Sequence, residues 1–221
     1  MEMTRFQPDT AKGENTMKIT WLGKACFALE KDGYTLLIDP YHNAGTGYPV
    51  LKAQAHEILV SHESNGHGWR KAVTLLPPGS ASPFTVETVE TYHDTLQGSQ
   101  RGPMTIHVIT DNEGVRVVHT GDMGTWTEDD LLRNADVLMV ESGSYRTMMS
   151  EELGQWACQM EPRIIIPMHY HHDRVLSRRV FTLEDLLYYI DPSYPVEYYD
   201  GNTMEVGKDT PRQVAVLKDI V

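Results

Sequence analysis

The chain contains the sequence MKITWLGKACFALEKDGYTLLIDP at residues 17–40. Its segments KITWLG, CFALE and YTLLIDP are short and apolar, and Gly or Lys-Asp-Gly separates them, which is typical of strands joined by tight turns. We therefore predict an N-terminal β meander. The strand pattern continues in EILVSH, FTVETVETYH, MTIHVIT and EGVRVVHTGD, and the segment WRKAVTLL is predicted to be a short helix that ends at Pro77.

The second half of the chain alternates predicted helices with apolar strands. A helix is predicted over residues 127–134, and the buried strand DVLMVE follows it. The next helix has apolar residues at helical spacing on one face, namely Leu153, Trp156, Ala157 and Met160. After the strand RIIIPMH comes a helix that Thr182 caps. Meanders combined with outer helices predict an α/β fold, a four-layer αββα sandwich.

The length favours one domain, because sandwich folds of 221 residues form a single unit. We assign residues 17–221 to this domain. Residues 1–16 lack the apolar core of a secretory signal and are expected to be a flexible extension. No apolar run approaches the ~20 residues of a membrane-spanning helix. Cys26 and Cys158 form no CxxC pair, so we expect a soluble protein of the reducing cytoplasm.

The charge balance argues against polyanionic partners. The chain has 31 acidic residues against 19 Lys and Arg, which gives a formal net charge of −12. Such a charge repels phosphate backbones and anionic lipid surfaces. Nucleic acid and membranes are therefore not expected partners, and a small molecule is the expected substrate.

Histidine and aspartate residues follow the apolar strand segments at four places. His62 follows EILVS, His93 follows VETVETY, Asp122 follows VRVVHTG and His169 follows RIIIPM. Any one of these imidazoles alone is more often a hydrogen-bonded or solvent-facing side chain. If the strands share an edge, however, their ends converge, and imidazoles with a carboxylate are ligands that zinc, manganese or iron accept. The four together favour a metal site.

Five segments in this order resemble the metallo-β-lactamase superfamily, especially a small bacterial branch of metal-dependent hydrolases related to a sugar-acid lactonase. They are MKITWLGKACFALE with LLIDPY, VSHESNGHGW, TYHDTLQGSQRG, VVHTGDMG and IIIPMHY. The resemblance covers about residues 17–205. It implies the metallo-β-lactamase fold and a homo-oligomer, since this branch is often oligomeric.

The resemblance implies a site with two metal positions. His62 and His93 would bind one metal, His67 and His169 the second, and Asp122 would bridge them, with Asp122 and His169 closest to the chemistry. Asp39 would support the histidine loop, although a turn residue before Pro40 is an equal interpretation. Arg101 would hold an anionic substrate group, although a solvated loop arginine is at least as good an interpretation.

The chain departs from the HxHxDH pattern of this branch. Ser64 stands where the pattern has its second histidine, and Gly66 stands where it has an aspartate, so each metal position loses one ligand. Lys24 replaces the histidine of a GHACF segment, and Thr125 replaces a frequent histidine after GDMG. The aspartate missing at 66 would orient the attacking water. Glu141, His171 and His172 are conceivable substitutes, whereas Glu63 is expected to point elsewhere.

Two functions remain open on this basis. The first is a hydrolase with one or two weakly bound divalent ions, zinc or manganese, that activate water against a small ester, lactone or phosphodiester. The second is a catalytically reduced or inactive member of the family that binds a small anionic ligand in the same pocket. In that case Lys24 would take part of the space of a missing cation and favour anion binding.

Overall fold

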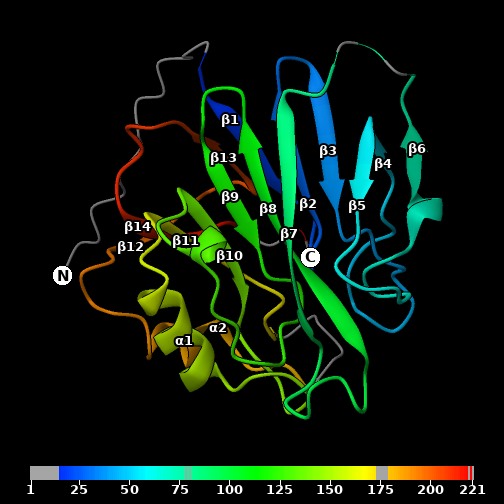
Figure 1. The fold of residues 1–221 in the computed structure, drawn as a ribbon. Helices are drawn as coiled ribbons and strands as arrows, with labels where there is room; N and C mark the ends of the chain where they lie inside the picture. The colour runs from blue at the N-terminus through cyan, green and yellow to red at the C-terminus, as the bar shows by residue number, and fades with distance from the viewer. Residues whose placement is uncertain (1–14, 78, 80, 173–178, 219, 221) are drawn as a thin grey trace.

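The computed structural model describes residues 15–77, 79, 81–172, 179–218 and 220, and its strands form two main sheets and a small third one (Figure 1). Most of the flexible extension predicted at residues 1–16 lies outside these residues. None of the helices in the described ranges is both long and apolar enough to cross a lipid bilayer.

The first main sheet has five strands in the order β13-β1-β2-β3-β5. They are Thr203–Val206 (β13), Met17–Trp21 (β1), Phe27–Lys31 (β2), Tyr34–Ile38 (β3) and Glu57–Leu59 (β5). The predicted meander is confirmed as β1–β3. Its second turn consists of Asp32 and Gly33, both at positive φ (50° and 75°), which is the conformation that a two-residue hairpin needs.

The second main sheet has seven strands in the order β12-β14-β11-β10-β9-β8-β7. They are Val196–Tyr198 (β12), Gln213–Val216 (β14), Ile164–Met168 (β11), Val137–Glu141 (β10), Arg116–His119 (β9), Pro103–Asp111 (β8) and Phe84–Tyr92 (β7). Every residue of β10 and β11 is buried, because both faces of these central parallel strands are covered.

The main hydrophobic core lies between these two sheets. Along β1, the side chains of Met17, Ile19 and Trp21 are buried, and the alternate residues are half-buried. The period of two follows from the pleat of the strand, which turns successive side chains to opposite faces. Side chains of β8–β11 meet them from the facing sheet and complete one continuous cluster.

Both α-helices lie on the side of the seven-stranded sheet. The helix α1 (Ser150–Gln159) packs against β10, and α2 (Leu183–Leu187) packs against α1. Figure 1 shows them together beside β10 and β11, away from β4–β6. The cap at Thr182 is confirmed, since its hydroxyl accepts a hydrogen bond from the amide of Asp185.

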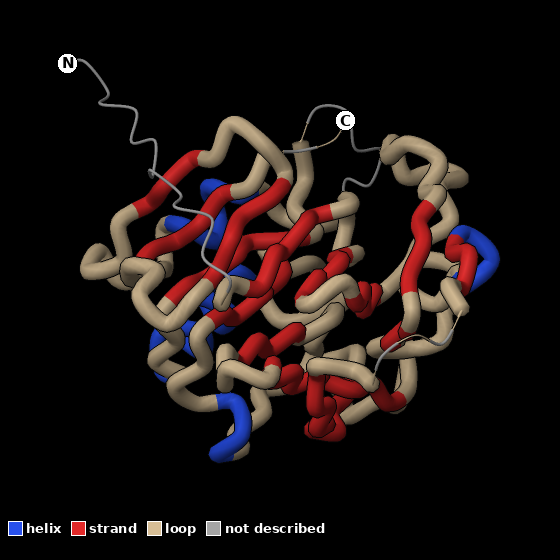
Figure 2. Tube along the Cα trace, turned by 90° about the horizontal axis from the view of Figure 1, so that it is seen from above, coloured by secondary structure: helices blue, strands red, loops and turns tan. Residues whose placement is uncertain are grey.

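The outer face of the five-stranded sheet is covered by short strands and a loop segment. A parallel pair of strands, β4 (Ala53–Ala55) and β6 (Val73–Leu75), lies there with the segment around Tyr41 and Tyr48. These elements enclose Cys26 and Leu37 in a second, smaller core. The α/β sandwich is therefore confirmed. Figure 2 shows the helical segments at the periphery of the strands.

Two predicted helices are wrong. The segment WRKAVTLL has only a 3₁₀ turn at Arg70–Ala72, because the β-branched run that follows pairs with β4 as strand β6. Residues 127–134 contain a 3₁₀ turn at Asp130–Leu132, which Asp129 caps through the amide of Leu131. There the positive φ of Asn134 (52°) leads the chain out of the turn and into β10.

Candidate metal centre

Three of the candidate ligands follow strands that end at the same edge of one sheet. In the seven-stranded sheet β7 and β9 each pair antiparallel with β8, and β9, β10 and β11 are parallel. The C-terminal ends of β7, β9 and β11 therefore point the same way, which brings together His93, Asp122 and His169. His62 and His67 differ from this expectation, because they lie in the loop after β5 of the facing sheet.

The first ligand group consists of His62, His93 and Asp122, whose ligating atoms lie within 4.8 Å of one another. The Nε2 atom of His93 lies 3.5 Å from Oδ2 of Asp122. This nitrogen is buried, and it has no hydrogen-bond partner among the described residues. Buried polar atoms almost always have a partner, so an unpaired nitrogen that faces a carboxylate fits a bound cation.

Hydrogen bonds fix which nitrogen of His62 is available. The hydroxyl of Ser61 donates to Asp39 over 2.6 Å, so its oxygen can only accept from Nδ1 of His62, at 3.1 Å. The Nε2 atom then carries the lone pair and faces the first group, with the Ser64 hydroxyl 3.3 Å away. Burial, followed by the neighbouring His67, lowers the pKa of His62 to about 3, so this imidazole is neutral, as a metal ligand must be.

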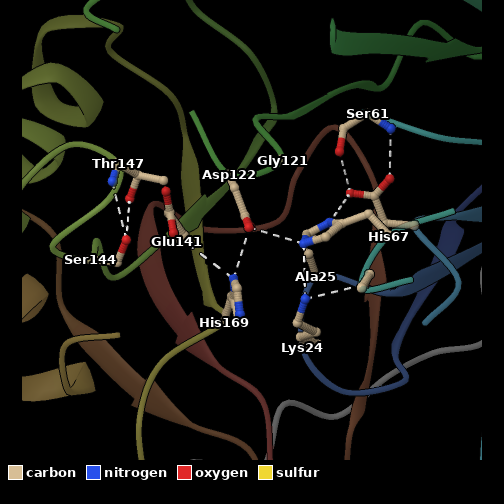
Figure 3. A network of polar contacts seen from close by, with 12 residues as sticks. Lys24, Ala25, Ser61, His67, Gly121, Asp122, Glu141, Ser144, Thr147 and His169 are labelled. Atoms are coloured by element: carbon tan, nitrogen blue, oxygen red, sulfur yellow. Dashed lines mark hydrogen bonds and ion pairs between the residues drawn. The ribbon is translucent and has the colours of Figure 1, made fainter. Parts of the chain in front are cut away.

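The second ligand group consists of His67, Asp122 and His169. The Nε2 atom of His67 lies 3.0 Å from Oδ2 of Asp122, and Nδ1 of His169 lies 2.9 Å from Oδ1 of the same carboxylate. Figure 3 shows Asp122 between the two rings, and the side chain of Lys24 reaches the same ring nitrogen of His67 that faces Asp122. The carboxylate of Asp122 therefore belongs to both groups.

Asp122 is ionised despite its burial. Burial alone would raise its pKa, but the charges of His67 and His169 outweigh burial and hold the pKa well below its ordinary value. For His67 burial alone would lower the pKa, but Asp122 and Asp39 together outweigh burial, so the pKa of this imidazole is raised. Burial lowers the pKa of His169. A negative carboxylate among imidazoles is a donor set suited to a divalent cation.

Asp39 supports the histidine loop from behind. Its carboxylate accepts hydrogen bonds from the Ser61 amide (2.7 Å) and hydroxyl, and its Oδ2 lies 2.8 Å from Nδ1 of His67. Asp39 is fully buried and sits at positive φ (49°), so it also turns the chain after β3. Both interpretations of this residue are therefore compatible with the structure.

The backbone is strained at three residues of the site. Lys24 (φ 56°), Asp39 (φ 49°) and His169 (φ 47°) all adopt the left-handed conformation, which side chains other than glycine rarely take. Such strain persists only where the surrounding structure imposes it, and it is concentrated at functional sites. The amide of His169 donates to the carbonyl of Lys24 over 3.1 Å, so two of these positions are coupled directly.

Of the residues considered as substitutes for the missing aspartate, Glu141 lies nearest to the site. It is fully buried, and its Oε2 atom lies 3.9 Å from Nδ1 of His169. Burial and the charge of Asp122 raise its pKa well above the ordinary value. Glu63 points away and pairs with Arg70 on the surface (2.8 Å), as expected. His171 and His172 belong to neither ligand group.

The sequence analysis missed Asp94, which shapes the loop that carries Arg101. Its carboxylate accepts hydrogen bonds from four backbone amides, those of Leu96, Gly98, Gln100 and Arg101. The hydroxyl of Thr125 donates to the carbonyl of Asp94 over 2.8 Å. An aspartate that precedes a Gly- and Ser-rich loop was the available signal, because such residues bond the amides that follow them.

Close packing at two glycines lets the loops approach the site. A β-carbon on Gly121 would lie 2.7 Å from the β-carbon of Ser61, and Gly121 has a φ of 58°. A β-carbon on Gly124 would lie 2.3 Å from the amide nitrogen of Asp94. Gly121 and Gly124 in the TGDMG segment therefore have to be glycine, so that the segment of Asp122 can meet loops from both sheets.

Comparisons with known proteins agree with this geometry. Residues 18–169 match the family model described as the beta-lactamase superfamily domain. A UPF0173 metal-dependent hydrolase from Archaeoglobus fulgidus is 29% identical over 197 residues, which cover 70% of this chain and 84% of that protein. A UPF0173 metal-dependent hydrolase from Pyrobaculum arsenaticum is 26% identical over 191 residues, with the same coverage of 70% and 84%.

Solved structures show the same relationship. A protein of the metallo-beta-lactamase superfamily from Thermotoga maritima has a TM-score of 0.68 and 30% identity, covering 91% of this chain and 98% of that one. An isothiocyanate hydrolase from Delia radicum gut bacteria has a TM-score of 0.59 at 15% identity, covering 85% and 98%, which is a likeness of fold alone. The chain therefore belongs to the metallo-β-lactamase superfamily, among its metal-dependent hydrolases.

Proposed function

We propose that this hydrolase holds one divalent ion, zinc or manganese, at His62, His93 and Asp122 and cleaves a small anionic ester, lactone or phosphodiester. The unpaired, buried Nε2 of His93, which faces Asp122, is the observation that carries the proposal. Two imidazoles and one carboxylate make three protein ligands, the usual number for a catalytic zinc that keeps an open position. The bound ion would supply Lewis acidity, which lowers the pKa of a water and polarises the substrate.

The residues around this position would each have a separate task. Ser61 and Asp39 hold the loop of His62 and His67, so that the imidazoles keep one orientation. Glu141, whose pKa is raised by burial and by Asp122, would donate a proton to a leaving oxygen. The Oε2 atom of Glu141 lies 3.9 Å from Nδ1 of His169.

Two cations next to the ligand groups favour an anionic substrate. Lys24 lies beside His67, with 3.0 Å between Nζ and Nε2. Arg101 is exposed, but its charge acts on the same site. Burial lowers the pKa of Lys24, and the charge of Arg101 lowers it further. A guanidinium that faces solvent beside a buried carboxylate cluster can hold the carboxylate or phosphate of an incoming substrate.

The proposal is tested by activity assays with three substrate classes. Purified protein with added zinc or manganese is assayed on an anionic aryl ester, a lactone that carries a carboxylate and a phosphodiester, before and after chelation. We expect turnover of at least one class that is lost on chelation and restored by the metal. If all three classes fail with metal bound, the hydrolase proposal is wrong for these substrates.

The second candidate function, an anion-binding member without turnover, is favoured by Lys24 and by Gly66, where a family aspartate is missing. It predicts saturable binding of the same anionic compounds by calorimetry, with no product formed. Because binding and turnover are measured on the same compounds, the two functions give different results.

Arg101→Ala is expected to raise KM for an anionic substrate and to leave kcat within a few-fold. A hydrogen bond to a charged group contributes about 1.5–3 kcal/mol, which corresponds to roughly a 10- to 100-fold change in binding. Arg179→Ala is a matched control, because this residue is exposed too and belongs to neither ligand group. An equal rise in KM for a neutral ester of the same size would show that Arg101 does not recognise the anion.

A further inference from the structure

We propose that the side chain of Lys24 takes the second metal position, so that one divalent ion and one lysine nitrogen together form the centre. The proposal rests on the proposed function, in which a single ion occupies the group of His62, His93 and Asp122. It concerns the other group, formed by His67, Asp122 and His169. In this group the nitrogen of Lys24 would stand where a second metal ion would otherwise bind.

The position of the lysine nitrogen is defined by two contacts. Nζ of Lys24 lies 3.0 Å from Nε2 of His67, and it donates to the carbonyl of Gly66 over 3.2 Å. Figure 3 shows Lys24 directed at His67, whose ring also faces Asp122. The lysine nitrogen therefore lies against the ring nitrogen of His67 that also faces Asp122, which is the atom that a second cation would have to use.

His67 has only one nitrogen to offer a metal. Its Nδ1 atom is taken by Asp39 at 2.8 Å, so Nε2 is the only atom left for ligation. The same Nε2 atom has Lys24 and Asp122 within 3.0 Å each. A metal in the second group would have to displace Lys24 first. The second group thus does not offer three free ligands, whereas the first group retains the unpaired Nε2 of His93.

The absence of a side chain at Gly66 leaves the space in which the nitrogen of Lys24 lies. A β-carbon on residue 66 would lie 2.4 Å from Nζ of Lys24 and 3.7 Å from its Cε. A side chain at 66 and a lysine nitrogen in this place therefore exclude each other sterically. The lysine nitrogen can stand in this place only because residue 66 is a glycine.

The backbone holds Lys24 in this orientation. The carbonyl of Lys24 accepts hydrogen bonds from Nε1 of Trp21 (2.9 Å) and from the amide of His169 (3.1 Å). The nitrogen also lies in the field of Asp122 and Asp39, both of which are ionised. A positive charge on this nitrogen would offset the charge of these carboxylates without depending on a free metal.

Metal stoichiometry tests the proposal. Wild type, Lys24→Ala and Lys24→Met are dialysed against excess zinc and then against buffer, and zinc per chain is measured by elemental analysis. We expect one zinc in wild type and two in both variants, because the substitutions free Nε2 of His67. Lys24→Arg, which keeps the charge, and the exposed Lys52→Met are expected to stay at one. Cobalt(II) gives an independent readout, since two ions bridged by Asp122 would be magnetically coupled.

The outcomes separate this inference from the proposed function. One zinc in wild type and in both Lys24 variants overturns the role of Lys24 and leaves the hydrolase proposal standing. Two zinc ions in wild type overturn it as well. If wild type binds none, the proposed function fails, and the inference fails with it, because no ion would share the centre with Lys24. Circular dichroism checks that each variant folds. The double variant Lys24→Ala, Gly66→Asp adds a fourth ligand at the second position. It is expected to hold the second zinc at least 10-fold more tightly than Lys24→Ala.

Discussion

His93→Ala is expected to abolish zinc binding at the first position. His93 is one of three ligands there, and loss of a group that merely supports a ligand already costs roughly 10- to 100-fold in affinity. The loss on removing a direct ligand should be at least as large. Isothermal titration calorimetry with zinc measures this loss of affinity. Any metal-dependent hydrolysis should fall in parallel.

The control for His93→Ala is His56→Ala. His56 lies outside both ligand groups, where its Nδ1 accepts a hydrogen bond from the Thr35 amide and its ring stacks on Tyr34. This variant should bind zinc as wild type does. Unchanged zinc affinity in His93→Ala would show that the buried Nε2 is not a ligand, and the assignment of the first group would have to be abandoned.

Asp39→Ala is expected to lower the free energy of unfolding of the metal-free protein by about 3–5 kcal/mol, the usual cost of removing one partner of a buried ionic pair. The substitution leaves the Ser61 amide and Nδ1 of His67 without their acceptor, and alanine tolerates the positive φ poorly. Urea denaturation measures the change. Asp39→Asn is the matched variant and should lose less, because asparagine keeps an acceptor oxygen and adopts this φ readily.

The effect of Asp39→Ala should depend on pH. Burial alone would raise the pKa of Asp39, but His67 outweighs it and the folded-state pKa lies below the ordinary 3.8. The contribution of ionised Asp39 to the free energy of unfolding is therefore present above pH 3.8. It is lost as the pH falls through the folded-state pKa. The pKa of His67 is raised above 6.5, so its contribution is full below pH 6.5 and is lost as the pH rises through the raised pKa. The difference in free energy of unfolding between wild type and Asp39→Ala should be largest between pH 3.8 and 6.5. A difference that grows below pH 3 would contradict the ion pair of Asp39 and His67.

Sequence patterns predicted the sheets well and the short helical segments poorly. The meander of β1–β3 was predictable because apolar alternation and the Asp-Gly turn point to the same structure. The segment WRKAVTLL was ambiguous, since its apolar residues fit either a helix face or a short strand. Pairing with β4, a contact distant in sequence, decided it.

The candidate ligands were predictable from their places after apolar strands, but their grouping was not. Sequence order gives no indication that His62 comes from the facing sheet while His93 and Asp122 share an edge. That depends on how the two sheets pack. The relation of Lys24 to Gly66 was equally hidden, because the residues are 42 positions apart and only the fold brings Nζ against the site of a β-carbon.

Anomalous X-ray diffraction at the zinc edge, from crystals of wild type grown with zinc, tests the central claim most directly. The account predicts one anomalous peak per chain, bounded by the Nε2 atoms of His62 and His93 and by Asp122, with Nζ of Lys24 remaining beside His67. A peak between His67, Asp122 and His169, with Lys24 displaced, would contradict it.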